Sequence, residues 1–242
     1  MSNKIAIAIP IGLMNRQDIA SALLSRHGTD YLFIGEIFKE TTTDKNCRIG
    51  ISSISNNDSN PIEELQFNKQ NKTLLSAIQN INRSQQIIYL TSTKVGYEAC
   101  LTMARFARIF LDLGGFAVNI ESAEIAHEAD KWLANYNSND VFDIYSLFVG
   151  LKEGENYYSC GMHNFGKADV SINITEDISL AIYVMNVFNY YRLTESPILQ
   201  DGHTFQPDIE SPRYQMKLVE DKEYEINSLQ HNCWGRWHLE RC

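Results

Sequence analysis

The chain begins with isoleucine and alanine in alternation over Lys4–Pro10. This period of two is typical of a β-strand, whereas apolar residues three and four positions apart predict helices. In the first third the patterns predict a strand over Lys4–Pro10 and then a helix that Asn15 caps. This helix carries Ile19, Leu23 and Leu24 on one face and ends near Gly28. After it come predicted strands over Tyr31–Phe38 and Cys47–Ile54, a loop over Ser55–Pro61, a helix over Glu63–Ile81 and a strand over Gln86–Leu90. The resulting order, β-α-β-β-α-β, is that of a ferredoxin-like unit.

The strongest helix signal lies in Val95–Leu113, where apolar residues recur at helical spacing until Gly114 and Gly115 end the pattern. After it the patterns predict a strand over Phe116–Asn119, a helix over Ser122–Asn135, a hairpin of strands over Phe142–Leu151 and Tyr157–Gly161, and a strand over Ala168–Ile174. The next predicted helix, over Asp177–Tyr191, has Ile178, Ile182, Met185 and Phe188 facing the core. An irregular link over Pro197–Pro212 and paired strands over Tyr214–Val219 and Tyr224–Ile226 follow. This part echoes the element order of the first without repeating its sequence.

We therefore predict an α+β fold of two ferredoxin-like, βαββαβ-type halves, with a mixed or antiparallel sheet and helices packed on one face. The expected parts are an N-terminal half over residues 1–93, a C-terminal half over residues 94–228 and an aromatic tail over residues 229–242. Trp234 and Trp237 lie in the tail. Because exposed tryptophan is costly, the tail either docks on the core or forms a contact surface.

Size and composition are those of a globular protein, with 242 residues and a hydrophobic fraction of 44%. No run approaches the ~20 apolar residues that cross a bilayer, and the start of the chain is too short and strand-like for a signal peptide. We therefore expect a cytoplasmic protein without a membrane partner. The net charge is −9, from 30 acidic and 21 basic residues, and no Lys/Arg cluster is present. This disfavours nucleic acid and suits a cationic protein partner.

Nucleophilic and nucleotide chemistry have little support in the sequence. The five cysteines are scattered and contain no Cys-x-x-Cys pair, which argues against a disulfide framework or a zinc knuckle. Cys160 or Ser159 could act as a nucleophile with His163, but a catalytic thiol needs a base held by a third group, and a thiol without a catalytic role is favoured. Gly114 and Gly115 end a helix instead of opening one, so they predict no phosphate cradle. We expect no cofactor.

The best candidates for other chemistry are His163 and His203, with Asp169 and Asp201 near them in sequence. Imidazole and carboxylate groups together can hold a zinc ion or move protons, as in a metal-assisted hydrolase. However, no His-x-His or His-Glu-x-x-His spacing is present, and Asp201 precedes a glycine, which is typical of a turn. The structural interpretation is favoured, so we predict no metal and assign no catalytic residue.

Two short runs resemble a known family. They are the sequence over Tyr157–Ile174, in which an aromatic strand enters Gly-Met, then Phe-Gly, then an acidic residue that opens an alternating strand, and the Asp-Gly-His-Thr-Phe turn over Asp201–Phe205. In order and spacing they resemble the bacterial domain-of-unknown-function 4261 family, over about Gln86 to Ser228. That family defines no reaction. Some of its members are associated with immunity proteins of toxin systems.

The resemblance and the acidic charge imply a binding protein more readily than an enzyme. We expect an immunity-type protein that neutralises a cationic toxin or effector domain by stoichiometric contact, which requires shape, charge and a few aromatic anchors. The candidate binding residues are Tyr157, Tyr158, His163, Asp169, Asp201, His203, Phe205, Trp234 and Trp237. Any of these anchors that is buried in the fold would be removed from the set. The alternatives are an enzyme with a cleft near His163, Asp169 and His203, and a homodimer built through exposed sheet edges.

Overall fold

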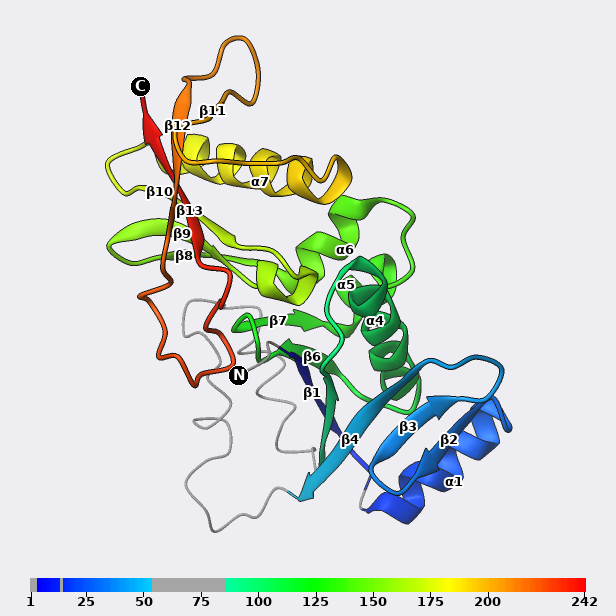
Figure 1. Cartoon of the computed structure of the whole chain (residues 1–242). Coiled ribbons are helices and arrows are strands. Elements are labelled where there is room, and N and C mark those ends of the chain that lie inside the picture. Colours follow the sequence, from blue (N-terminus) through cyan, green and yellow to red (C-terminus); the bar gives the residue numbers. More distant parts are fainter. Residues whose placement is uncertain (1–3, 14, 54–85) are drawn as a thin grey trace.

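The computed structural model describes residues 4–13, 15–53 and 86–242. Within these ranges the chain forms two β-sheets with helices packed on them, which confirms the predicted α+β class (Figure 1). Each sheet contributes to a hydrophobic cluster of its own. The predicted loop over Ser55–Pro61 and the predicted helix over Glu63–Ile81 lie outside the described residues. No helix in the described part of the chain is long and apolar enough to span a membrane.

The first sheet has seven strands in the order β2-β3-β4-β5-β1-β6-β7, and all neighbouring strands are antiparallel. Their bounds are β1 Ile5–Ile11, β2 Tyr31–Ile34, β3 Ile37–Glu40, β4 Asn46–Ser53, β5 Gln86–Ser92, β6 Ala117–Ile120 and β7 Ile125–Glu128. Strand β1 lies between β5 and β6 and is buried along its whole length. The strands predicted at the positions of β1, β4, β5 and β6 are confirmed.

The single strand predicted over Tyr31–Phe38 is wrong, because the chain reverses inside it. Strands β2 and β3 form a hairpin in which Ile34 pairs with Ile37, leaving Gly35 and Glu36 as a two-residue turn. Gly35 has a φ of +61°, a backbone conformation that glycine adopts without a steric penalty. The apolar residues on either side of the turn continue the same pattern, so their alternation does not mark the reversal.

Helices α1 (Arg16–His27) and α4 (Tyr97–Asp112) contribute to the same hydrophobic cluster as the first sheet. The side chain of Asn15 accepts the backbone N–H groups of Gln17 and Asp18, which confirms the predicted cap of α1. Two of the three residues predicted on its buried face are buried, but Leu24 is 61% exposed. The predicted helix over Val95–Leu113 is confirmed by α4.

The segment between residues 122 and 153 differs most from the prediction. Instead of one helix over Ser122–Asn135, the chain forms strand β7 and the short helix α5 (Ala129–Asn135). Instead of a strand over Phe142–Leu151, it forms helix α6 (Val141–Phe148) and strand β8 (Gly150–Glu153). Pairing with β6 draws Ile125–Glu128 into the sheet, and the Asp140 side chain starts α6 by accepting the N–H of Phe142. Long-range pairing and a cap therefore override the local pattern.

The second sheet has six strands in the order β11-β12-β13-β10-β9-β8. The bounds of the remaining elements are β9 Asn156–Cys160, the 3₁₀ helix η1 Met162–Phe165, β10 Asp169–Asn173, α7 Ile178–Thr194, β11 Thr204–Phe205, β12 Tyr214–Val219 and β13 Arg236–Arg241. Strands β10 and β13 are parallel and the other neighbours are antiparallel, so this sheet is mixed. Helix α7 packs against β9 and β10, at the end of the molecule away from α1 (Figure 1).

The last strand belongs to the second sheet. The predicted pairing of Tyr214–Val219 with Tyr224–Ile226 is wrong, because β12 pairs with β13, which lies between β12 and β10. Six residues of the predicted aromatic tail, Arg236–Arg241, therefore form a strand of the sheet. The first sheet in turn extends to Glu128, past the expected boundary at residue 93. The ferredoxin-like arrangement of each half is not confirmed.

Candidate functional site

The structure distributes the predicted site residues over several elements of the C-terminal part of the chain. Tyr157 and Tyr158 lie on β9, His163 on η1, Asp169 at the start of β10, Asp201, His203 and Phe205 in the link that ends in β11, Trp234 in the turn before β13, and Trp237 on β13. Tyr158, His163 and Asp169 are buried and offer no contact surface, while Tyr157, Phe205 and Trp237 are partly buried. Asp201, His203 and Trp234 are exposed.

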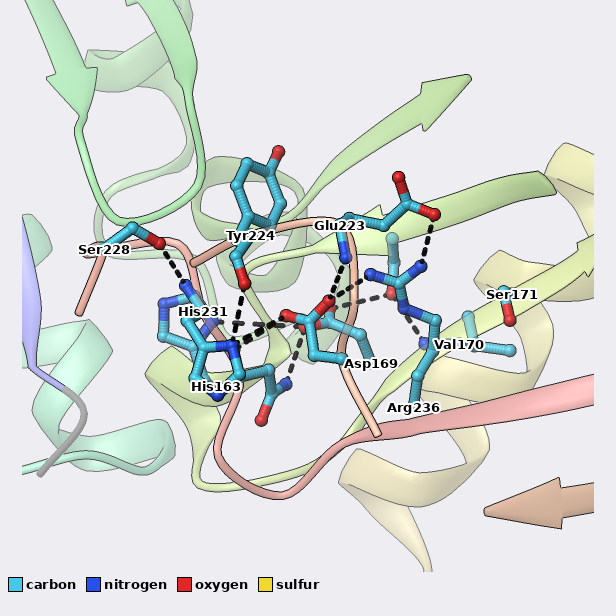
Figure 2. Close-up of polar contacts among 12 residues, drawn as sticks. His163, Asp169, Val170, Ser171, Glu223, Tyr224, Ser228, His231 and Arg236 are labelled. Atoms are coloured by element: carbon cyan, nitrogen blue, oxygen red, sulfur yellow. Dashed lines mark hydrogen bonds and ion pairs between the residues drawn. The ribbon is translucent and has the colours of Figure 1, made fainter. Parts of the chain in front are cut away.

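Asp169 is the centre of a buried polar network (Figure 2). Its Oδ1 accepts hydrogen bonds from Ser159 Oγ at 2.9 Å and from the backbone N–H of Met162 at 3.1 Å. Its Oδ2 accepts a hydrogen bond from Asn232 Nδ2 at 2.6 Å. Asn232 lies 63 residues further along the chain, in the segment that leads into β13, so the carboxylate joins two distant segments.

The network continues from Asn232 to a buried ion pair. The backbone N–H of Asn232 donates to Asp221 Oδ2 at 2.9 Å, and Arg236 Nη2 lies 2.6 Å from Asp221 Oδ1. Arg236 also reaches Glu223 at 3.3 Å, and its guanidinium lies 4.5 Å from the centre of the Tyr158 ring. Buried charges in folded proteins are normally paired and hydrogen-bonded, and those of Asp169, Asp221 and Arg236 are. The network is therefore of the kind that stabilises a fold.

His163 lies beside this network but does not complete a catalytic site. Its Nδ1 is 4.0 Å from Asp169 Oδ2, its side chain is fully buried, and neither ring nitrogen has a hydrogen-bond partner among the described residues. His203 is exposed, and within the described ranges no hydrogen bond or ion pair links it to His163 or Asp169. Over the same ranges no three His, Cys, Asp or Glu side chains are grouped so that they could hold a metal ion.

The thiol considered as a nucleophile is enclosed as well. Cys160 is buried, and burial, followed by the charge of Asp169, raises its pKa well above the usual value of a thiol. The Ser159 hydroxyl donates to Asp169 and accepts the backbone N–H of Val170, so it is engaged in the network. A nucleophile needs an ionised or base-activated group within reach of a substrate, and neither side chain meets this condition here.

Helix α7 presents an unusual surface. Of its 17 residues only Arg192 is charged, and Arg192 is buried, where its Nη1 donates to the carbonyl of Ala168 at 2.7 Å. The side of the helix that faces solvent also exposes Ser179 and Thr194. Its large apolar and aromatic residues, called the α7 face below, are between 36% and 50% exposed; they are Ile178, Ile182, Tyr183, Tyr190 and Tyr191. A helix that exposes several large apolar side chains and no charge is typical of an element that a partner covers.

The core stripe predicted for this helix is half wrong. Met185 and Phe188 are buried as expected, together with Ala181 and Val184, but Ile178 and Ile182 are exposed. Polar residues lie on both sides of the helix, Ser179 and Thr194 on the exposed side and Asn189 and Arg192 on the buried side, so periodicity could not assign the exposed side. The shortage of charged residues over Ile178–Thr194 was the sequence signal that could have revealed this face.

Neighbouring segments extend the α7 face. The Phe142 ring, on α6, lies edge-on to that of Tyr190, with centroids 6.3 Å apart. Tyr183 donates its hydroxyl to Asp208 Oδ2 at 2.9 Å, which holds the link between β11 and β12 beside the helix (Figure 1). Next to Asp208 in that link, Ile209 is 94% exposed.

Acidic residues predominate in the part of the sequence that contains this apolar surface, although one of them, Glu176, lies 3.5 Å from Arg241 of β13. Residues 173–212 contain six carboxylates and one basic residue other than histidine, the buried Arg192. The six, called the acidic border below, are Glu176, Asp177, Glu195, Asp201, Asp208 and Glu210. The predicted residues Asp201, His203 and Phe205 lie in the same segment, and Phe205 stacks on Tyr191 with centroids 6.1 Å apart. An apolar centre with an acidic border matches the usual layout of a protein interface.

No protein-family model matches the chain, and no curated protein and no solved structure matches it significantly. The resemblance to the domain-of-unknown-function 4261 family therefore stays a prediction, and the functional argument depends on the residues of this chain.

Proposed function

We propose that this chain is a cytoplasmic binding protein of the immunity type, which neutralises a cationic bacterial toxin or effector domain by stoichiometric contact. The observation that carries the proposal is the α7 face, a group of five exposed isoleucine and tyrosine side chains on a helix that exposes no charge. Large exposed apolar patches on folded proteins are uncommon and mark interaction sites. Tyrosine is also enriched at the centres of protein interfaces, because its ring is large and rigid.

The charge around the α7 face favours a basic partner. The acidic border places carboxylates at both ends of the helix, Asp177 at its N-cap and Glu195 at its C-cap, and no exposed Lys or Arg lies between residues 173 and 212. Opposite charges across an interface accelerate encounter and disfavour wrong partners. A toxin domain that acts on nucleic acid or on another acidic substrate has a basic surface of the required sign.

The predicted chemical alternative has less support from geometry. A catalytic role for His163 and Asp169 would need substrate to reach a pair of side chains that are 0% and 3% exposed. The polar groups around them are occupied by the contacts that hold β13 and β10 together. A binding role instead uses groups that are already at the surface.

A growth assay tests this function. The products of the genes on either side of this one are expressed singly in a bacterial host, with and without this protein. We expect one product to stop growth and the wild-type chain to restore it. The double variant Ile182→Glu/Tyr190→Glu, which places charge on the α7 face, should fail to restore growth. Ile34→Glu changes an isoleucine that is 58% exposed on β2, far from α7, and should act like the wild type.

The proposal fails if neither product is toxic, or if the double variant protects as well as the wild type. Protection by protein present far below the level of the toxic product would indicate turnover, and would favour an enzyme. Soluble expression of the variants at wild-type levels is the control for folding.

A further inference from the structure

A second surface, far from α7, has the opposite electrostatic character. The hairpin of β2 and β3, helix α4 and the end of α5 enclose a pocket of about 160 Å³ that is open to solvent. Its lining contains three cationic side chains, Lys45, Arg105 and Arg108, and one carboxylate, Glu40. On a chain with a net charge of −9, this concentration of positive charge is a local exception.

The two arginines are held in place while their terminal nitrogens stay available. Arg105 Nε donates to Asn137 Oδ1 at 2.9 Å, and Arg108 Nε lies 3.0 Å from Asp112 Oδ2. The Arg108 guanidinium also lies 5.7 Å from the centre of the Tyr136 ring. Among the described residues no acceptor holds the Nη atoms of either arginine or Nζ of Lys45. Arginine donors that are oriented in advance suit oxyanions.

Aromatic rings form the other part of the lining. They are those of Tyr31, Phe106 and Tyr136. The Tyr31 ring is fixed by stacking on Phe38, with centroids 5.6 Å apart. Burial raises the pKa of the Tyr31 hydroxyl, the charges of Glu40 and Asp30 raise it further, and the charges of Arg108 and Arg105 lower it. Glu40, Arg105 and Arg108 line the pocket together with Tyr31. A planar apolar group could lie against these rings while an oxyanion meets the guanidinium groups.

We propose that this pocket binds a small phosphate monoester, with the phosphate on Lys45, Arg105 and Arg108 and its ester group against Tyr31 and Tyr136. The lining has an excess of two positive charges. The Asp112 carboxylate, which pairs with Arg108, offsets part of this excess. A phosphate monoester carries a charge of about −1.5 to −2 at neutral pH and three acceptor oxygens, whereas a carboxylate carries one charge. A closed cavity of about 150 Å³ holds a benzene ring, so the volume suits a small ligand.

Calorimetric titration with phenyl phosphate tests the proposal, with benzoate and inorganic phosphate as comparison ligands at constant ionic strength. We expect saturable 1:1 binding of phenyl phosphate, about tenfold tighter than that of benzoate, because an additional charge-assisted contact is worth about a factor of ten or more. Inorganic phosphate should bind more weakly than phenyl phosphate, because it makes no ring contact.

The variants Lys45→Gln and Arg105→Gln should each weaken phenyl phosphate binding about tenfold or more. Lys45→Gln is the cleaner test, because the Lys45 side chain makes no hydrogen bond or ion pair within the described ranges, so its replacement should leave the fold unchanged. Arg26→Gln, on the solvent side of α1, is the matched control and should bind like the wild type. Equal affinity for phenyl phosphate and benzoate, absence of saturable binding, or wild-type binding by Lys45→Gln and Arg105→Gln would overturn the proposal.

Discussion

The ring of Phe142 lies edge-on to the ring of Tyr190, with centroids 6.3 Å apart, so that α6 and α7 present one continuous aromatic surface. Both side chains remain more than one third exposed after making this contact. The pair therefore does not bury either ring. An aromatic pair that stays open to solvent in this way is available to a partner, because a partner could remove the remaining apolar area from water.

The exposed residues of α7 should contribute little to the stability of the isolated chain. We expect Ile178→Gln and Ile182→Gln to change the free energy of unfolding by no more than about 0.5 kcal/mol, because neither side chain is buried. Phe188→Ala, on the buried side of the same helix, should cost about 3–5 kcal/mol through the cavity that it leaves. Urea unfolding followed by circular dichroism measures all three. A large loss of stability from the glutamine variants would mean that the α7 face is packed within the chain.

The hydrogen bond from Asn232 to Asp169 should be important for stability. Asn232→Ala removes donors from the Asp169 carboxylate and from the carbonyl of Lys167, and leaves a buried charge with fewer partners. We expect a loss of about 2–4 kcal/mol in the free energy of unfolding. Asn227→Ala, at an exposed position of the same segment, should change it by less than about 0.5 kcal/mol. Equal effects of the two substitutions would contradict a structural role for the network.

Two glycines with positive φ should respond differently to a methyl group. A Cβ at Gly161, where φ is +125°, would lie 2.1 Å from the carbonyl oxygen of Phe148. A Cβ at Gly202, where φ is +83°, would meet nothing closer than 3.9 Å. We expect Gly202→Ala to cost about 1 kcal/mol through backbone strain alone, and Gly161→Ala to cost more than about 3 kcal/mol or to prevent folding. Thermal unfolding ranks the two variants. Similar melting temperatures would show that the turn after β9 is looser than described.

His127 should make the protein less stable as the pH falls. Burial, and then the charge of Lys131, lowers its pKa from 6.5 to about 4, while its Nε2 lies 3.0 Å from the carbonyl oxygen of Leu147. Above pH 6.5 the imidazole is neutral in both states and its contribution is complete. Between pH 6.5 and 4 the unfolded chain takes up a proton that the folded chain does not, so this contribution is lost as pH falls.

The expected loss from His127 is about 3 kcal/mol at most, from a pKa difference of about 2.5 units. Carboxylates also respond to acid, so the informative quantity is the difference between the wild type and His127→Gln, which retains a donor for Leu147. Chemical unfolding at pH 7 and at pH 4 should show a smaller loss for the variant. Parallel pH profiles for the two proteins would rule out this role.

The sequence predicted the elements whose partners are close in the chain or whose pattern is unambiguous. Strand β1 alternates isoleucine with alanine, α1 has the Asn15 cap and Gly28 at its end, and α4 has one apolar side. These signals are local, so tertiary contacts did not change them. The hairpin of β8 and β9 was also placed correctly in its second strand.

The errors lie where a distant partner decides the structure. Nothing in Tyr214–Val219 shows that its neighbour in the sheet is Arg236–Arg241, because a closer strand-like segment intervenes. The run over Val141–Phe148 is apolar enough for a buried strand or a buried helix, and only the cap and the packing against α7 distinguish them. For the same reason the acids and histidines that were predicted as a site include Asp169, which instead joins two segments 63 residues apart.

The measurement that tests the central claim most directly is a calorimetric titration of the growth-inhibiting neighbour product with this chain. For the wild type we predict a 1:1 stoichiometry and a dissociation constant that rises as the salt concentration is raised. The affinity of Ile182→Glu/Tyr190→Glu should be at least about 100-fold lower, because charge replaces two anchors at the centre of the interface. Ile34→Glu should titrate like the wild type. Undiminished binding by the double variant, or wild-type protein that does not bind the product at all, would contradict the account.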